Sequence, residues 1–344
     1  MKPHLSTIAN GDPLSRAEAE DAMRQMMSGE ARSEHTAALL MGLRSRGETL
    51  DELVGFTTVM REFAVPVEID DPHAIDLCGT GGDGADTFNI STTASLVAAG
   101  AGVTVAKHGN RSVSSKSGSA DVLEALGVNI DLKKEGVEYC LNEAGIAFLF
   151  APFFHPAMKH VMPVRTSLGV RTFFNILGPL CNPAGVTRQI VGAFNTQTAQ
   201  MMVRILAQLD ADHVVTLHSK DGMDEVSVSA PTTLFEYDAS EDTPVPRSRE
   251  IGPEKHDIER SPASALRGGT AEDNAQILRG ILSGSDRSPR RDVVVLNAAY
   301  ALHTSDRFED LDTAFAAAEE SIDSGAALDT LETLAAVSQA APTE

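Results

Sequence analysis

A glycine-rich loop is followed closely by short polar side chains in residues 79–92. Four glycines and Asp83 form the loop, and the polar side chains after it are Thr87, Asn89, Ser91 and Thr92. Glycine allows the backbone to approach a ligand closely and to adopt a positive φ. The free N–H groups at the start of a following helix attract negative charge. These residues therefore predict a site that binds phosphate groups or another anion.

A positively charged segment, residues 107–111, follows one helix later. Lys107 ends a run of strand type, and open α/β sheets bind ligands at the carboxyl ends of their strands. The glycine loop also matches G-x-G-x-x-G, the fingerprint of dinucleotide-binding proteins. That fingerprint requires an acidic residue at the end of the second strand, where this chain has Lys107 and His108. The sequence therefore favours a phosphorylated substrate over NAD. The serine-rich segment 114–121 then leads into another helix.

Two arginines, Arg165 and Arg171, lie close in sequence to aromatic residues and to His155. A guanidinium group binds a planar carboxylate through two parallel hydrogen bonds. A helix end with solvated arginines explains the same pattern equally well. This segment alone leaves both interpretations open.

Two adjacent carboxylates, Asp224 and Glu225, follow a predicted strand that ends near residue 217. Magnesium is a hard cation that proteins bind through one or two carboxylates together with substrate phosphates. A single Asp-Glu pair is more often part of a solvated surface. The phosphate-type loop earlier in the chain favours the metal interpretation.

The composition restricts the class of protein. With 344 residues, the chain is expected to form two domains, or one large domain and a small one. Its 49 acidic and 28 basic residues give a net charge of −21, which opposes nucleic-acid binding. No apolar run approaches the roughly 20 residues that span a membrane, and the N-terminus lacks a signal-peptide pattern. The three cysteines have no metal or disulfide spacing. We expect a cytoplasmic protein with no nucleic-acid or membrane partner.

The predicted elements indicate an α/β fold: a small helical domain and a larger α/β domain with a mostly parallel central sheet. Residues 1–70 are predicted to be helical, with capping boxes at Ser15 and Thr49. From residue 74 onward, strands alternate with helices, which is typical of a largely parallel sheet. The expected strands are 74–78, 103–106, 147–150, 189–193, 213–217 and 292–295. Residues 238–262 are polar and rich in proline, and are predicted to form surface loops or an irregular excursion.

Several motifs, in order along almost the whole chain, resemble those of the anthranilate phosphoribosyltransferases. They are residues 78–84, 107–111, 117–121, 155–159, 163–165, 171–180 and 224–225, extended by 268–269 and 296–299. The resemblance implies the nucleoside phosphorylase-like fold. It places the small domain at residues 1–70, with a returning helical segment near 156–185, and the α/β domain at 71–155 and 186–344.

The resemblance also implies the reaction. The 5-phosphoribosyl group of 5-phosphoribosyl 1-diphosphate (PRPP) would pass to the amino nitrogen of anthranilate, with release of pyrophosphate, in tryptophan biosynthesis. It further implies two Mg²⁺ per subunit and a homodimer. No covalent nucleophile is expected, so no residue is assigned as catalytic in that sense.

Site residues follow from the resemblance, position by position. PRPP would be bound by Gly79, Gly82, Asp83, Thr87, Asn89, Ser91, Thr92, Lys107 and Ser119. Anthranilate would be bound by Gly79, His108, Asn110, His155, Met158, Arg165, Gly178 and Pro179. The metal ligands would be Ser91, Asp224 and Glu225.

Two other functions compete with this interpretation. A pyrimidine nucleoside phosphorylase has the same fold and would use inorganic phosphate and a nucleoside. Arg165 and the Asp224-Glu225 pair favour PRPP and an aromatic acid instead. A non-enzymatic, nucleic-acid-binding relative of the same fold is opposed by the charge of −21.

Overall fold

The computed structural model describes residues 1–112 and 116–342 of the chain. Ser114 and Ser115 of the serine-rich segment, and the last two residues of the tail, lie outside the described part. No helix in the described part is long and apolar enough to cross a membrane.

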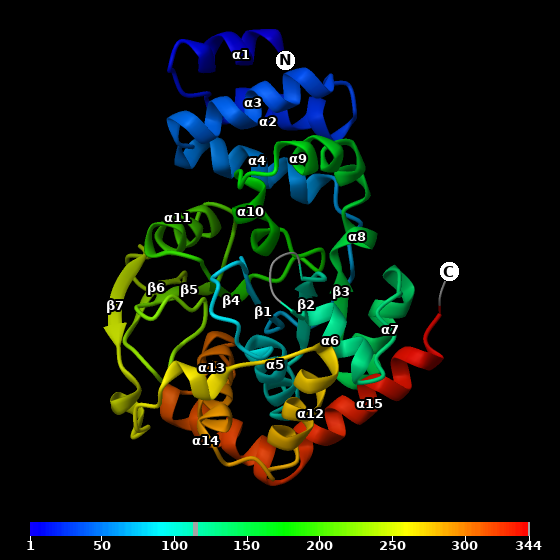
Figure 1. Cartoon of the computed structure of the whole chain (residues 1–344), viewed down its shortest axis with the longest axis vertical. Coiled ribbons are helices and arrows are strands. Elements are labelled where there is room, and N and C mark those ends of the chain that lie inside the picture. Colours follow the sequence, from blue (N-terminus) through cyan, green and yellow to red (C-terminus); the bar gives the residue numbers. More distant parts are fainter. Residues whose placement is uncertain (113–115, 343–344) are drawn as a thin grey trace.

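A small helical bundle forms one end of the molecule (Figure 1). Its helices are α1 (Lys2–Ala9), α2 (Arg16–Met27), α3 (Ser33–Arg46) and α4 (Leu50–Glu62). The predicted capping boxes at Ser15 and Thr49 are both confirmed, with Glu18 and Glu52 completing them. Gly47 ends α3 with φ of 90°, which a residue with a side chain rarely adopts.

A returning segment joins this bundle from the middle of the chain. It contains α9 (Met162–Leu168) and α10 (Phe174–Leu177), flanked by the short helices α8 (Ala151–Phe154), η1 (Pro156–His160) and η2 (Gly178–Leu180). The buried apolar residues of α9 and α10 share one hydrophobic core with α2, α3 and α4, and this core continues into the helix α11 (Thr196–Leu206) and the adjoining strands. The division into domains at residues 70, 155 and 185 stays a prediction, because this core crosses it.

A seven-stranded sheet forms the centre of the larger part, in the order β3-β2-β1-β4-β5-β6-β7. Its strands are β1 (Ile75–Gly79), β2 (Val105–Gly109), β3 (Ile146–Phe150), β4 (Arg188–Gly192), β5 (His213–Ser219), β6 (Thr232–Asp238) and β7 (Arg247–Ile251). The first five are parallel to one another, whereas β6 pairs antiparallel with β5, and β7 pairs antiparallel with β6. The predicted fold class is confirmed.

The strand predicted at 292–295 is wrong, because these residues lie in helix α13 (Pro289–Thr304). Three consecutive valines suggested a strand, but Ser288 caps the helix and Pro289 occupies its first turn. Almost every side chain of α13 is buried. A helix that is apolar on all sides lacks the 3.6-residue period that would distinguish it from a buried strand.

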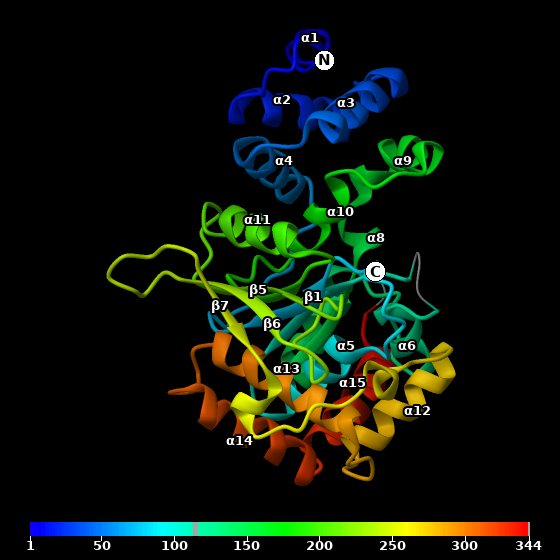
Figure 2. The same cartoon turned by 60° about the vertical axis from the view of Figure 1, so that its left-hand side comes forward.

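The prediction of irregular structure at 238–262 is also partly wrong, because β7 lies there and β6 reaches residue 238. Residues 247–250 of β7 are exposed at the edge of the sheet. An exposed edge strand needs no apolar alternation, so its sequence carries little strand signal. The connection between β6 and β7 projects from the body of the molecule (Figure 2).

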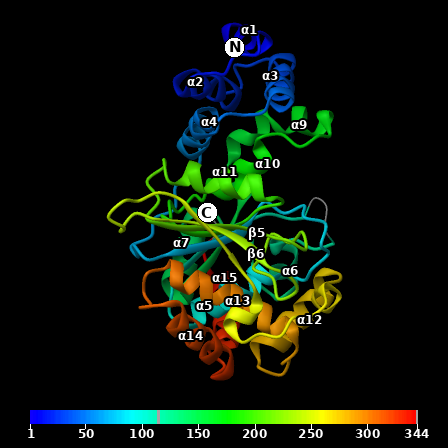
Figure 3. The same ribbon diagram turned by 90° about the vertical axis from the view of Figure 1, so that its left-hand side faces the viewer.

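Helices cover both faces of the sheet. Helix α11 packs on one face, between the sheet and the bundle (Figure 3). The other face is covered by α5 (Ile90–Gly100) and α13, with α12 (Ala271–Leu282), α14 (Leu311–Asp323) and α15 (Ala326–Ala340) packed against them. The remaining helices are α6 (Ser119–Ala125), α7 (Lys134–Ala144), η3 (Pro253–His256) and η4 (Ala263–Leu266).

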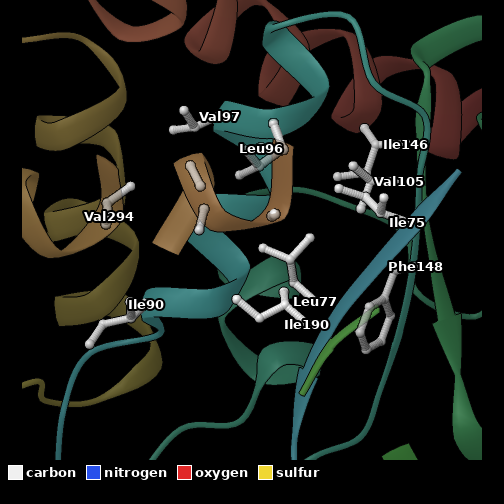
Figure 4. Packing of buried hydrophobic residues seen from close by; sticks show 14 of the residues in the cluster. Ile75, Leu77, Ile90, Leu96, Val97, Val105, Ile146, Phe148, Ile190 and Val294 are labelled. Atoms are coloured by element: carbon white, nitrogen blue, oxygen red, sulfur yellow. The ribbon is translucent and has the colours of Figure 1, made fainter. Parts of the chain in front are cut away.

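Helix α5 is held tightly in this layer. Leu96 and Val97 lie together on α5, and Leu77 and Ile190 of the sheet lie beside each other (Figure 4). All four side chains belong to one buried cluster. Because α5 begins just after the glycine loop, this packing fixes the helix start at which the anion site is predicted.

Candidate active site

The glycine loop lies at the carboxyl end of β1, where ligands bind in open α/β sheets. Gly81, Gly82 and Gly84 have φ of 61°, 71° and 75°. These are left-handed conformations that strongly favour glycine. The loop therefore depends on its glycines for its shape, as the sequence predicts.

The acid pair predicted from the sequence closes over this loop. The carboxylate of Asp224 accepts a hydrogen bond from Gly81 N–H at 3.0 Å. That of Glu225 accepts one from Ser91 N–H, at the start of α5, at 3.1 Å. Asp83 accepts a hydrogen bond from Asp224 N–H at 3.4 Å. Residues far apart in the chain thus form one acidic group.

The carboxyl groups of this acidic group disfavour one another's ionised form, because they are buried close together. Burial, and then the charge of Asp83, raise the pKa of Asp224 to about 7. Burial, and then the charge of Asp224, raise the pKa of Glu225 to about 8. Carboxylate and hydroxyl oxygens are the ligands that Mg²⁺ prefers, and a bound cation would relieve the repulsion between the carboxylates. Gly79 leaves room for Asp224, since a Cβ there would lie 2.7 Å from its Oδ2. The donor set fits a divalent cation.

Lys107 lies deeper than the sequence suggests. Its side chain is only 3% exposed, and its amine donates a hydrogen bond to Leu77 O at 2.5 Å. Burial lowers the pKa of Lys107, while Asp76 and Glu225 oppose that effect. Asp76 is fully buried, and it accepts hydrogen bonds from His108 N–H at 3.1 Å and from Asn182 at 2.8 Å. Lys107 therefore supplies positive charge to the acidic group, and its contact with phosphate stays a prediction.

The remaining residues predicted to bind PRPP lie around the starts of α5 and α6. Asn89 donates a hydrogen bond to Ser117 O at 3.2 Å and accepts one from Asn274 at 2.9 Å. Ser119 donates to Asn110 O at 3.3 Å. Thr92 is buried, and Thr87 forms an isolated bridge with Arg267. The two contacts of Asn89 join the start of α5 to Ser117 and to Asn274 of α12.

A cavity of about 520 Å³ opens beside the glycine loop, toward the returning segment. All eight residues predicted to bind anthranilate line it: Gly79, His108, Asn110, His155, Met158, Arg165, Gly178 and Pro179. Met60 from α4 and Phe174 from α10 also line it. Gly79 lines this cavity and also lies against Asp224 of the acidic group, so the two parts of the site meet there.

Arg165 is one of the cationic residues that line this cavity, beside Lys159, and its planar guanidinium suits a carboxylate. Its guanidinium lies over the ring of Phe174, 5.0 Å from the ring centroid. Among the described residues it forms no ion pair, and burial lowers its pKa. A desolvated guanidinium without an acidic partner is ready to bind a carboxylate in two parallel hydrogen bonds.

Arg171 has a different role. It donates a hydrogen bond to Gly82 O at 2.6 Å and lies over the ring of Phe194, 4.7 Å from its centroid. It therefore connects the returning segment to the glycine loop. Of the two arginines singled out in the sequence, only Arg165 lines the cavity.

Comparison with known proteins places the chain in a family. The helical bundle domain of the glycosyl transferase family matches residues 2–64, and the a/b domain of that family matches residues 71–328. An anthranilate phosphoribosyltransferase from Salinibacter ruber is 77% identical over 344 residues, covering 100% of both chains. One from Rhodopseudomonas palustris is 51% identical and covers 99% of each chain.

The chain belongs to the anthranilate phosphoribosyltransferase family.

Solved structures of this family have the same fold. The enzyme from Thermus thermophilus matches with a TM-score of 0.90 and 39% identity, covering 98% of this chain and 99% of the other. The Saccharomyces cerevisiae enzyme in complex with PRPP and Mg matches with a TM-score of 0.88 and 27% identity, covering 98% and 97%. The family predicted from the motifs is confirmed, and the two competing functions are set aside.

Three residues that organise this phosphoribosyltransferase site were not predicted. Asp76 and Asn182 lie beneath Lys107, and Asn274 lies behind Asn89. Asp76 does leave a signal in the sequence, because it is an acidic residue inside an apolar strand. A buried charge needs partners. Asp76 has them in His108 N–H and Asn182, and the charge of Lys107 on the neighbouring strand also favours its ionised form. Asn182 and Asn274 have no comparable signal, since each lies far along the chain from the residue that it contacts.

Two buried histidines predict an acid-sensitive fold. The rings of His108 and His155 lie 5.1 Å apart in the wall of the cavity. Burial lowers the pKa of His108 to about 3 and that of His155 to about 4. An unfolded histidine has a pKa of about 6.5. Below that pH, the unfolded state binds protons at these histidines, whereas the folded state does not bind them until the pH is much lower. The free energy of unfolding should fall by about 2 kcal/mol per histidine between about pH 6.5 and pH 5.

Urea unfolding at pH 7 and pH 5 checks this expectation. The variant His155→Asn should lose less stability between the two pH values than the wild type. His160→Asn is the matched control, because His160 is exposed on the adjoining helix. Equal losses in His155→Asn and the wild type would contradict the assignment.

Proposed function

We propose that this chain transfers the 5-phosphoribosyl group of PRPP to the amino nitrogen of anthranilate, with release of pyrophosphate, in tryptophan biosynthesis. The observation that carries the proposal is the junction at Gly79. The glycine loop and start of α5 lie on one side of it, and the cavity with Arg165 lies on the other. The Saccharomyces cerevisiae relative has been seen with PRPP and Mg and with 4-fluoroanthranilate.

In this proposal, the chain acts mainly by placing its two substrates. The backbone N–H groups of the loop and of α5 bind the negatively charged PRPP, and Arg165 binds the carboxylate of anthranilate. The amino nitrogen then attacks C1 of the ribose as the bond from C1 to pyrophosphate breaks, and the nitrogen gives up its extra proton to water. Because an aromatic amine is neutral at pH 7, it needs orientation more than activation. His108 and His155 are held neutral, and no general base is required.

We propose that Asp224, Glu225 and Ser91 hold magnesium, with two ions per subunit. Magnesium would supply positive charge that stabilises the departing pyrophosphate. The support is the oxygen-rich donor set and the crowding of its carboxylates. Asp83 lies within the same acidic group. Its carboxylate accepts a hydrogen bond from the backbone N–H of Asp224 and so helps to position Asp224.

The direct test mixes the purified protein with anthranilate, PRPP and Mg²⁺ and follows the loss of anthranilate fluorescence. Loss that requires both PRPP and Mg²⁺ is expected. If PRPP binds by calorimetry but fluorescence does not change, the acceptor is wrong. Nucleosides and other aromatic acids would then be tested as acceptors.

The homodimer that the resemblance implies and the cytoplasmic location expected from the composition both stay predictions. Light scattering tests the first, since a dimer has twice the 36.4 kDa mass of the chain. The domain boundaries at residues 70, 155 and 185 are likewise proposed. Limited proteolysis would test them by cleaving first near those positions.

Gly79→Ala should reduce the activity while leaving the fold intact. The new Cβ would lie 2.7 Å from Asp224 Oδ2, so the carboxylate must move. A displacement of about 1 Å in a catalytic site can lower the rate on the order of 100-fold. Gly280→Ala in α12 is the control, because its Cβ would meet its nearest atoms at 3.7 and 3.9 Å. Steady-state rates decide, and equal rates for the two variants would contradict the role of Gly79.

A further inference from the structure

A second group of metal-ligating side chains lies away from the active site. His213 begins β5, Glu236 lies on β6 and His303 lies on α13. One ligand atom from each lies within 4.8 Å of the other two. Since the glycine loop and the acid pair lie at the carboxyl end of the parallel strands, this group lies at the opposite end of β5.

The individual contacts are close to those of a coordination site. Nε2 of His213 lies 3.1 Å from Glu236 Oε1, and Nε2 of His303 lies 3.9 Å from the same oxygen. The two imidazole rings are nearly perpendicular, with an interplanar angle of 81°. Zinc bonds of about 2.0–2.1 Å in a tetrahedron separate neighbouring ligand atoms by about 3.3 Å. Small side-chain rotations would therefore bring all three atoms onto one ion.

Asp306 prepares His213 for this role. It lies 2.7 Å from Nδ1 of His213, on the side away from Glu236. When Nδ1 donates its proton to Asp306, the lone pair of Nε2 faces the carboxylate of Glu236. Two acceptors that face each other at 3.1 Å need either a proton or a metal cation between them. A carboxylate behind a histidine is also the usual second partner of a metal-binding histidine.

The neighbouring charges leave the shared oxygen of Glu236 available. Arg249 pairs with the other oxygen, Oε2, at 3.1 Å. Arg188 pairs with the outer oxygen of Asp306 at 3.0 Å. These arginines hold the carboxylates in position without occupying the space between the histidines.

A proton is the competing occupant of this space. Burial alone would lower the pKa of His213, but hydrogen bonds to Asp306 and Glu236 outweigh it and raise the pKa to about 9. A protonated His213 accounts for these two contacts. It does not account for His303, whose Nε2 faces the same Glu236 oxygen at 3.9 Å, beyond hydrogen-bond distance. The His303 side chain is 26% exposed, so a cation can reach it from solvent.

We propose that His213, Glu236 and His303 form a binding site for a divalent cation of the zinc type. Two imidazole nitrogens and one carboxylate oxygen suit Zn²⁺ better than Mg²⁺, which prefers oxygen ligands. Water would complete the coordination. The ion would connect β5, β6 and α13, and so fasten the antiparallel edge of the sheet to the helical layer.

The test is a calorimetric titration of the full chain with Zn²⁺ at about pH 8, in about 5 mM Mg²⁺ to occupy the oxygen-rich active site. The wild type should bind one Zn²⁺ per chain under these conditions. His303→Gln and Glu236→Gln should each weaken that binding at least tenfold. His256→Gln is the matched control, because His256 contacts α13 through Tyr300 but lies outside the group. It should bind Zn²⁺ as the wild type does.

X-ray absorption at the zinc edge of the wild type tests the site without any variant. Two imidazole ligands are expected. A signal from oxygen ligands only would assign the ion to the acidic group and overturn the proposal. Unchanged affinity in folded His303→Gln, or no Zn²⁺ binding in the presence of Mg²⁺, would overturn it as well. Enzymatic activity does not enter any of these outcomes.

Discussion

Glu225→Gln should lower kcat/KM for PRPP by about a thousandfold, which corresponds to about 4 kcal/mol of transition-state stabilisation. Glutamine has the same shape and still accepts the hydrogen bond from Ser91 N–H. What it lacks is the negative charge that would hold magnesium beside the departing pyrophosphate. The measured rate should also need more Mg²⁺ to reach its maximum.

The stability of Glu225→Gln should not fall. Burial and the charge of Asp224 raise the pKa of Glu225 to about 8, so the folded protein without metal disfavours this charge. Removing it should leave Tm unchanged or raise it, as happens when strained site residues are replaced. Glu254→Gln is the control, because Glu254 is exposed and paired with Arg260. If Glu225→Gln has a kcat/KM within about threefold of the wild type, the proposed role of Glu225 in holding magnesium is wrong.

Local signals in the sequence predicted the elements that depend on local chemistry. The capping boxes at Ser15 and Thr49 are built from residues three positions apart, and both form as expected. The first five strands also follow their apolar runs. The errors at α13 and β7 have the opposite cause, because burial on all sides and exposure at a sheet edge come from the tertiary arrangement. Neither is encoded in a short window.

The candidate site was predictable in its parts but not in its assembly. The glycine loop is recognisable because positive φ demands glycine at Gly81 and Gly82. Residue composition alone does not show that Asp224 meets this loop, and the resemblance to a family supplied that link. The depth of Lys107 and the contact between Arg171 and Gly82 arise only when the sheet and the returning segment come together. No pattern in the sequence foretells either.

Replacement of Arg165 should affect the binding of anthranilate more than the chemical step. Its guanidinium is partly desolvated over Phe174 and has no acidic partner among the described residues. A hydrogen-bonded charge pair of this kind contributes about 1.5–3 kcal/mol, or roughly 10- to 100-fold in binding. Arg165→Ala should therefore raise the KM for anthranilate by that factor, with the KM for PRPP nearly unchanged. Arg165→Lys should give an intermediate value, because lysine keeps the charge but loses the planar double hydrogen bond.

Aniline provides the internal control for Arg165, because it has the reacting amine of anthranilate but no carboxylate. If Arg165 binds the carboxylate, the wild type and Arg165→Ala should use aniline with the same low kcat/KM. The fall in kcat/KM on removing the arginine and the fall on removing the carboxylate would then report the same interaction. If Arg165→Ala loses activity equally with aniline and with anthranilate, the arginine shapes the cavity and does not bind the acid. The assignment of the acceptor end of the site would then pass to another residue of the cavity wall.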